Sequence, residues 1–158
     1  MTLPDRKAWI GLAGWAVLCY GAALFAGRFP VGEWYAALAK PAWTPPGWIF
    51  APVWTVLYGM MATAAWLVWK ARGFSGARLA LALFAAQLAL NVAWTWLFFG
   101  LHRPGVAAVD IALLWAAILA MLLAFLRIRR LAGVLLVPYL AWVTFAAALN
   151  VEIWRLNA

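Results

Sequence analysis

The chain consists of five long apolar stretches, separated by short breaks that carry most of its basic residues. A helix needs about 20 apolar residues to cross the hydrocarbon core of a bilayer. A length of 158 residues therefore accommodates five spans with their connections and leaves no room for a soluble domain. Only 10% of the residues are charged, against about a quarter in soluble domains. The sequence predicts an all-α integral membrane protein, a bundle of five transmembrane helices.

One connection is long, and it is rich in tryptophan and proline. Proline disfavours the α conformation in the residue before it, so Lys40-Pro41 and Thr44-Pro45-Pro46 predict a non-helical stretch, with the next helix starting at Pro46 or Gly47. The first span follows Arg6 and Lys7 like a signal peptide, but its apolar stretch is longer than a typical signal core, and we expect it to stay uncleaved. We predict a single domain over residues 1–158, with spans at about 9–27, 48–69, 79–99, 106–126 and 132–151 and a lid over 28–47.

The basic residues are divided unequally between the two sides of such a bundle. The formal net charge of +8 comes from side chains at helix ends, which favours a membrane surface over nucleic acid as the reason for it. Cytoplasmic connections carry the excess of lysine and arginine. We predict a bacterial inner-membrane protein, and in that membrane the rule places the N-terminus in the cytoplasm; in an outer membrane, the alternative, the rule would not apply. The N-terminal side carries Arg6, Lys7, Lys70, Arg72, Arg78, Arg127, Arg129 and Arg130, and the lid side carries Arg28, Lys40, Arg103 and Arg155.

The third span has two chemically different faces. At about 100° per residue, Gln87, Asn91, Trp94 and Thr95 share one face. Amides in hydrocarbon need hydrogen-bond partners, so this face should look into the bundle, either to join helices or to line a ligand cavity. The opposite face is a stripe of small residues that permits close helix approach. We expect this stripe to be a homodimer seam, with a lipid-facing surface as the alternative; it consists of Ala82, Ala86, Ala89 and Ala93.

Aromatic stripes mark the second and fifth spans. Trp54, Tyr58 and Met61 follow helical spacing, as do Trp142, Phe145 and Ala146 after Pro138. Such stripes commonly pack helices together, but the small Ala146 one turn from Trp142 leaves space beside an indole. Pro138 removes a backbone hydrogen bond and predicts a kink in span five.

The ionisable residues exclude several kinds of site. Asp110 lies early in span four, where an acidic residue is either functional or an interfacial residue favoured at a helix N-terminus. No cluster of histidine, cysteine and carboxylates suggests a metal site, and no nucleophile, base and orienting residue are set out for hydrolysis. We therefore expect no required metal or cofactor. Cys19 is the only cysteine, so an intramolecular disulfide is excluded.

Three blocks of sequence resemble a known family. The first is WYAALAKPAWTPPGWIFAPVWTVLY at residues 34–58; the second is Gln87…Asn91…Trp94-Thr95…Phe98-Phe99-Gly100; the third is Pro138-Tyr139-Leu140…Trp142…Leu149-Asn150…Trp154-Arg155. In this order they resemble the TspO family, which comprises bacterial tryptophan-rich sensory proteins and the mitochondrial translocator protein, or peripheral benzodiazepine receptor. The resemblance implies a five-helix bundle, a homodimer and a pocket beneath a Trp34–Trp48 lid.

The resemblance also implies a ligand and its binding residues. The implied ligand is a tetrapyrrole, chiefly protoporphyrin IX, whose propionates would suit Arg28, Lys40 and Arg103. No buried histidine is available for haem iron, which favours metal-free porphyrin. Eukaryotic relatives carry a tyrosine in a proposed cholesterol motif where this chain has Val151-Glu152, so we expect no tight cholesterol binding. Taken together, the helical faces and the resemblance predict these ligand-binding residues: Tyr35, Trp43, Pro45, Trp48, Trp54, Tyr58, Gln87, Asn91, Trp94, Thr95, Asp110, Trp142, Phe145 and Ala146.

Three functions follow as expectations from the resemblance. The first is a tetrapyrrole-binding sensor or transporter. The second is an enzyme that degrades porphyrin in light and oxygen, with Trp54 and Trp142 as catalytic residues. The third is a membrane adaptor whose partner reads the ligand state.

Overall fold

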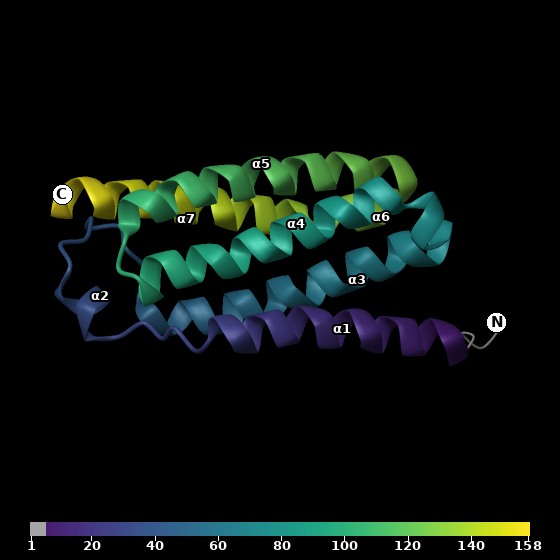
Figure 1. The fold of residues 1–158 in the computed structure, drawn as a ribbon, viewed down its shortest axis with the longest axis horizontal. Helices are drawn as coiled ribbons and strands as arrows, with labels where there is room; N and C mark the ends of the chain where they lie inside the picture. Colours follow the sequence, from purple (N-terminus) through teal and green to yellow (C-terminus); the bar gives the residue numbers. More distant parts are fainter. Residues whose placement is uncertain (1–5) are drawn as a thin grey trace.

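The computed structural model describes residues 6–158, which form a bundle of helices with no strand in that range (Figure 1). Five segments are long and apolar enough to cross a membrane, so the predicted five-span fold is confirmed and the chain is a multi-pass integral membrane protein. The α-helices are α1 (Arg6–Ala26), α2 (Glu33–Ala37), α3 (Phe50–Gly76), α4 (Arg78–Thr95), α5 (Pro104–Ile128), α6 (Arg130–Val134) and α7 (Val137–Asn157). A 3₁₀ turn (Gly47–Ile49) precedes α3, and a π-helical turn (Trp96–Gly100) follows α4.

Helices joined by short connections lie antiparallel to each other. α4 packs on α5 across one such connection, and α5 packs on α7, which follows the short helix α6; α1 packs on α3, to which the long lid joins it. The lid and the C-terminus lie at one end of the bundle, and α1 begins at the other end (Figure 1). The N-terminal end and the lid end of the bundle are thus opposite each other, and the cytoplasmic position of the N-terminal end stays a prediction.

The second span ends at a glycine. α3 extends to Gly76, beyond the predicted end at residue 69, but Gly73 inside it has a φ of 64°. Glycine adopts this left-handed conformation without the steric cost that a Cβ would bring. The regular helix thus ends just after the basic residues Lys70 and Arg72, which lie at the bundle end.

The fifth span is broken, where the sequence predicted one kinked helix over residues 132–151. α6 ends at Val134, and α7 begins at Val137 after a turn. Pro138 occupies the first turn of α7, where its missing N–H leaves no helical hydrogen bond unmade. The predicted interior kink is therefore wrong: the chain stops one helix and starts another. α7 also continues to Asn157, past the predicted end of the span.

The lid is partly helical. The non-helical stretch predicted from Pro41 to Pro46 is confirmed, but residues Glu33–Ala37 form the short helix α2. Lys40 closes this helix: its Nζ donates hydrogen bonds to the carbonyl oxygens of Tyr35, Ala36 and Leu38 at 2.6, 3.2 and 2.9 Å. The side chain of Asn157 also pairs with both the N–H and the C=O of Ala39, at 3.0 and 2.9 Å. The lid is thus fixed to the end of α7.

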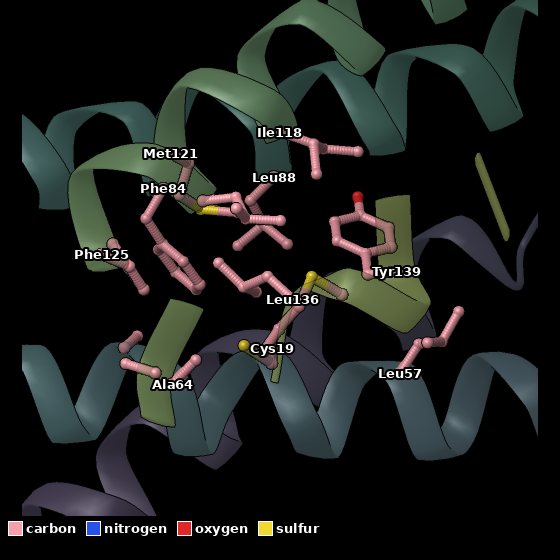
Figure 2. Packing of buried hydrophobic residues seen from close by; sticks show 14 of the residues in the cluster. Cys19, Leu57, Ala64, Phe84, Leu88, Ile118, Met121, Phe125, Leu136 and Tyr139 are labelled. Carbon is pink, nitrogen blue, oxygen red and sulfur yellow. The ribbon is translucent and has the colours of Figure 1, made fainter. Parts of the chain in front are cut away.

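The core fills the space between all the long helices. Figure 2 shows side chains from α1, α3, α4, α5 and α7 meeting around Leu136. Met61, Phe125 and Tyr139 are fully buried there. Large buried apolar side chains of this kind fix the mutual positions of the helices because packed interiors leave few voids. A cavity next to such a core is therefore unusual and marks a candidate site.

The alanine stripe of α4 lies on the outside of the bundle. Ala82, Ala86 and Ala89 are exposed and Ala93 is half-buried, so the homodimer seam stays a prediction. We expect Ala86→Leu and Ala89→Leu to lower the dimer fraction in detergent, because a larger side chain separates closely packed helices. Analytical ultracentrifugation measures this fraction. Ala116→Leu on the exposed face of α5 is the control; an unchanged dimer in both α4 variants would refute the seam.

Candidate functional site: a cavity beneath the lid

A cavity of about 410 Å³ lies at the lid end of the bundle. This volume is within the range of small-molecule sites, which are mostly apolar with a few placed polar groups. The lining residues come from α1, the start of the lid, the 3₁₀ turn before α3, α3, α4, the π-helical turn and α7. They are Tyr20, Ala23, Ala26, Gly27, Phe29, Pro30, Val31, Gly47, Phe50, Ala51, Trp54, Thr55, Tyr58, Asn91, Trp94, Thr95, Phe99, Trp142 and Ala146.

Three tryptophans form much of the wall. Trp54, Trp94 and Trp142 come from α3, α4 and α7, so three helices each contribute one indole. Ala146 lies one helical turn after Trp142 and also lines the cavity. Its small side chain leaves space beside this indole, as its spacing predicted. The wall therefore offers flat aromatic surfaces suited to a flat apolar ligand.

A chain of buried hydrogen bonds forms the polar floor. The Tyr58 hydroxyl donates to Asn91 Oδ1 at 2.7 Å, and Asn91 Nδ2 donates to the Tyr139 hydroxyl oxygen at 2.9 Å. The Tyr139 hydroxyl in turn donates to Gln87 Oε1 at 2.8 Å, and Gln87 Nε2 lies 3.7 Å from Met61 Sδ. The two amides thus have partners inside the bundle, as their helical face predicted. Of the residues in this hydrogen-bond network, only Tyr58 and Asn91 line the cavity.

A second polar contact holds the Trp94 wall. The indole Nε1 of Trp94 donates to Asn150 Oδ1 at 2.9 Å, and Asn150 Nδ2 donates to the carbonyl oxygen of Pro104 at 2.8 Å. Asn150 is 1% exposed, so these bonds are shielded from water. They join α4, α7 and the start of α5, and they orient an indole of the cavity.

Half of the predicted ligand-binding residues line this cavity: Trp54, Tyr58, Asn91, Trp94, Thr95, Trp142 and Ala146. The other predicted residues lie around it. Gln87 is behind the floor, and Phe145 stands between Trp142 and Trp43 of the lid, with ring centroids 5.5 and 5.7 Å away. Pro45 is half-buried in the lid and Trp48 is 74% exposed.

Tyr35 and Asp110 are buried outside the cavity. Tyr35 packs against Phe98 and Phe99 at ring distances of 6.2 and 5.6 Å, and burial raises the pKa of its hydroxyl. Asp110 is buried on α5, and its Oδ2 has no hydrogen-bond partner within residues 6–158. Neither residue is among those lining the space where we expect a ligand.

Sequence reasoning missed the α1 side of the cavity. Tyr20 and Ala23 lie on α1, and Gly27 directly follows it. This helix has no polar or aromatic stripe, and nothing in the local pattern marks these residues. Tyr139 was also missed as part of the floor, although it belongs to the third block of the resemblance. The hydroxyl of Tyr20 donates to the carbonyl oxygen of Thr55 at 2.9 Å, which closes the cavity between α1 and α3.

The cations near the mouth differ in availability. Lys40 uses its ammonium group on three carbonyl oxygens of the lid and also lies 4.8 Å from the Tyr35 ring centre, so it is committed to structure. Arg28 is exposed between Gly27 and Phe29, which line the cavity. Arg103 is exposed at the start of α5. Arg28 is therefore the cation best placed for an anionic group of a ligand.

The lone histidine supports the lid. The ring of His102 stacks on Trp34 with centroids 4.3 Å apart and planes at 10°. Trp34 also meets the edge of Phe98.

In residues 6–158, no group of three histidine, cysteine or carboxylate side chains could hold a metal ion. The site therefore offers aromatic walls, a polar floor and a cation, which is the chemistry of ligand binding.

Comparison with known proteins matches the chain over most of its length. The model of the TspO/MBR family matches residues 15–155. A tryptophan-rich protein TspO from Chlorobaculum tepidum is 45% identical over 89% of this chain and 94% of that protein. A translocator protein from Homo sapiens is 41% identical over 94% of this chain and 91% of its own length. A tryptophan-rich sensory protein from Cereibacter sphaeroides is 47% identical over 79% of this chain and 77% of that protein.

Proposed function

Since this chain belongs to the TspO/MBR family, as its motifs predicted, we propose that it is a membrane sensor or transporter that binds a tetrapyrrole, chiefly protoporphyrin IX. Relatives named sensory protein and translocator protein support a role in sensing or moving a ligand. The single observation that carries the proposal is the cavity at the lid end with an indole wall from each of three helices.

The chemistry of the cavity fits this ligand class. A tetrapyrrole is flat, apolar and aromatic, and indole faces stack on such rings. Its propionates need cations or water, and Arg28 beside the lining offers a guanidinium that forms charge-assisted hydrogen bonds. The edge of the macrocycle would lie between Trp54 and Trp142, with the carboxylates directed towards the lid surface.

We place the protein in a bacterial inner membrane as a homodimer, with its N-terminus in the cytoplasm. The excess of basic residues at the bundle end away from the lid gives this orientation in an inner membrane, and the alanine stripe on the outside of α4 is the basis for the homodimer. The cavity would then open on the periplasmic side. Flux of porphyrin into liposomes that contain the purified protein would separate transport from sensing.

Titration with protoporphyrin IX in the dark tests the proposal. We expect saturable quenching of tryptophan fluorescence, and a loss of affinity of up to about tenfold in Trp54→Phe or Trp142→Phe, because aromatic stacking contributes roughly 0.5–1.5 kcal/mol beyond burial. Trp9→Phe is the control, since Trp9 is exposed near the far end of α1. Unchanged affinity in both cavity variants would place the binding site elsewhere.

One observation favours the enzymatic alternative. The ring centroid of Trp54 lies 5.7 Å from that of Tyr58 and 6.2 Å from that of Tyr139, so an oxidised indole would have two phenols beside it. In this alternative, Trp54 and Trp142 are the catalytic residues for degradation of porphyrin in light and oxygen, as the resemblance implies. Illumination of the same samples decides between the two functions. If the Phe variants keep their porphyrin affinity but no longer form new absorbing products, the protein is an enzyme. If affinity and product formation both fall slightly and in parallel, the protein is a binder.

A further inference from the structure

A second hollow lies on the outside of the bundle, between α3 and α7. Its lining is Pro52, Val53, Val56, Leu57 and Met60 on α3 and Pro138, Ala141 and Trp142 on α7. Here α3 packs mainly on α1, and α7 packs mainly on α5. The two helices meet on their inner side, where the rings of Trp54 and Tyr139 are 6.2 Å apart, so a groove remains along the outer side of this seam.

The groove has the chemistry of the bilayer interior. None of its lining side chains is charged, and the only N–H group on them is that of Trp142. Val56 is 61% exposed, and Pro52, Pro138 and Ala141 are exposed as well, so the groove opens towards the surroundings of the bundle. Since α3 and α7 belong to membrane spans, these surroundings are hydrocarbon.

The dimensions indicate which part of the bilayer fits. Residues 52 to 60 extend about 12 Å along the α3 axis at 1.5 Å per residue. This length starts near the lid end of α3 and stays within the roughly 15 Å that one leaflet contributes to a 30 Å core. The groove runs along the helices, and the flexible Met60 side chain adapts to irregular apolar partners. A single extended hydrocarbon chain matches this length and this apolar lining.

We propose that this groove binds one acyl chain of a phospholipid from the lid-side leaflet. The acyl chain would lie against Trp142, which lines both the groove and the cavity. One indole therefore separates the bound acyl chain from the ligand space. The acyl-chain site does not depend on the proposed function; only its effect on the ligand does.

Trp142 is placed to transmit the state of the groove. Its Nε1 is buried and has no hydrogen-bond partner in the described part of the chain, so no hydrogen bond holds the ring in place. Its ring centroid lies 5.9 Å from that of Phe50, which lines the cavity, and 5.5 Å from that of Phe145, which contacts Trp43 of the lid. An acyl chain behind Trp142 supports the ring from the lipid side and stabilises the cavity wall.

Fluorine NMR of the full chain tests the site directly. The protein is labelled with 5-fluorotryptophan in detergent micelles, and the Trp142 resonance is assigned with Trp142→Phe. The probe is phosphatidylcholine with a nitroxide in the middle of one acyl chain. We expect saturable broadening of the Trp142 resonance. Ala141→Phe fills the groove and should weaken this binding about tenfold, whereas Ala116→Phe on the exposed face of α5 should not.

The outcomes distinguish the occupants. Broadening that rises linearly with lipid and equals that of the exposed Trp154 would mean bulk contact and would overturn the site. Absent broadening together with a dimer that Ala141→Phe dissociates would assign the groove to a second copy instead. Protoporphyrin IX affinity in Ala141→Phe then tests the coupling: a shift of about threefold or more, absent in Ala116→Phe, supports it. If the wild type binds no porphyrin, the proposed function fails, but the acyl-chain result stands.

Discussion

Replacing Ala146 by tryptophan is expected to lower protoporphyrin IX affinity by about a hundredfold or more, equivalent to roughly 2.7 kcal/mol. Ala146 is 8% exposed and lines the cavity of about 410 Å³ beside Trp142. A fourth indole would occupy the space that the ligand needs. Overpacking a filled core costs about 1–3 kcal/mol, but here the new side chain enters an existing cavity, so the fold should survive.

Ala148→Trp is the matched control for this change. Ala148 lies on the same helix but is exposed on the outside of the bundle, so the same substitution adds bulk without filling the cavity. Both variants and the wild type are titrated in the dark, and their thermal unfolding in detergent is followed in parallel. Wild-type affinity in a folded Ala146→Trp protein would show that ligand binds elsewhere.

The largest expected loss of stability comes from Asn91→Leu. Asn91 is 2% exposed and joins the hydroxyls of Tyr58 and Tyr139 across three helices. Interhelical hydrogen bonds in membrane proteins contribute about 0.6 kcal/mol on average and up to about 1.7 kcal/mol each. Losing two of them and leaving the Tyr58 hydroxyl unpaired should cost about 1–3 kcal/mol of unfolding free energy, measured by reversible unfolding in mixed micelles.

The double variant Tyr58→Phe/Asn91→Leu shows whether the hydrogen bond is responsible. Removing both partners of a buried pair costs less than removing one, because no polar group is left unsatisfied. We therefore expect the double variant to be more stable than the sum of the single losses implies. Strictly additive losses, or a single Asn91→Leu variant within about 0.3 kcal/mol of wild type, would contradict the assigned network.

The sequence by itself determined the architecture and the inward faces. In hydrocarbon, the backbone N–H and C=O groups of a single span must form their hydrogen bonds within that span. Each apolar stretch therefore predicts a helix whatever the rest of the sequence is. The same argument turned Gln87 and Asn91 of α4 inward, and helical spacing placed Trp54 and Tyr58 on one face of α3. The proline pattern also located the non-helical part of the lid, because proline acts on its own and the preceding residue.

Only the tertiary structure decided which inward residues share a space. Spacing gives the face of a helix but not the partner that it meets, so Tyr20 reached the cavity unpredicted, and Phe145 and Asp110 did not reach it. Tyr139 joined the polar floor because α7 packs where the amides of α4 needed partners. Lys40 was predicted as a cation for the ligand, yet it closes α2, a helix that depends on contacts with the bundle rather than on its five residues. The partners of each side chain were set by the packing of helices distant in sequence.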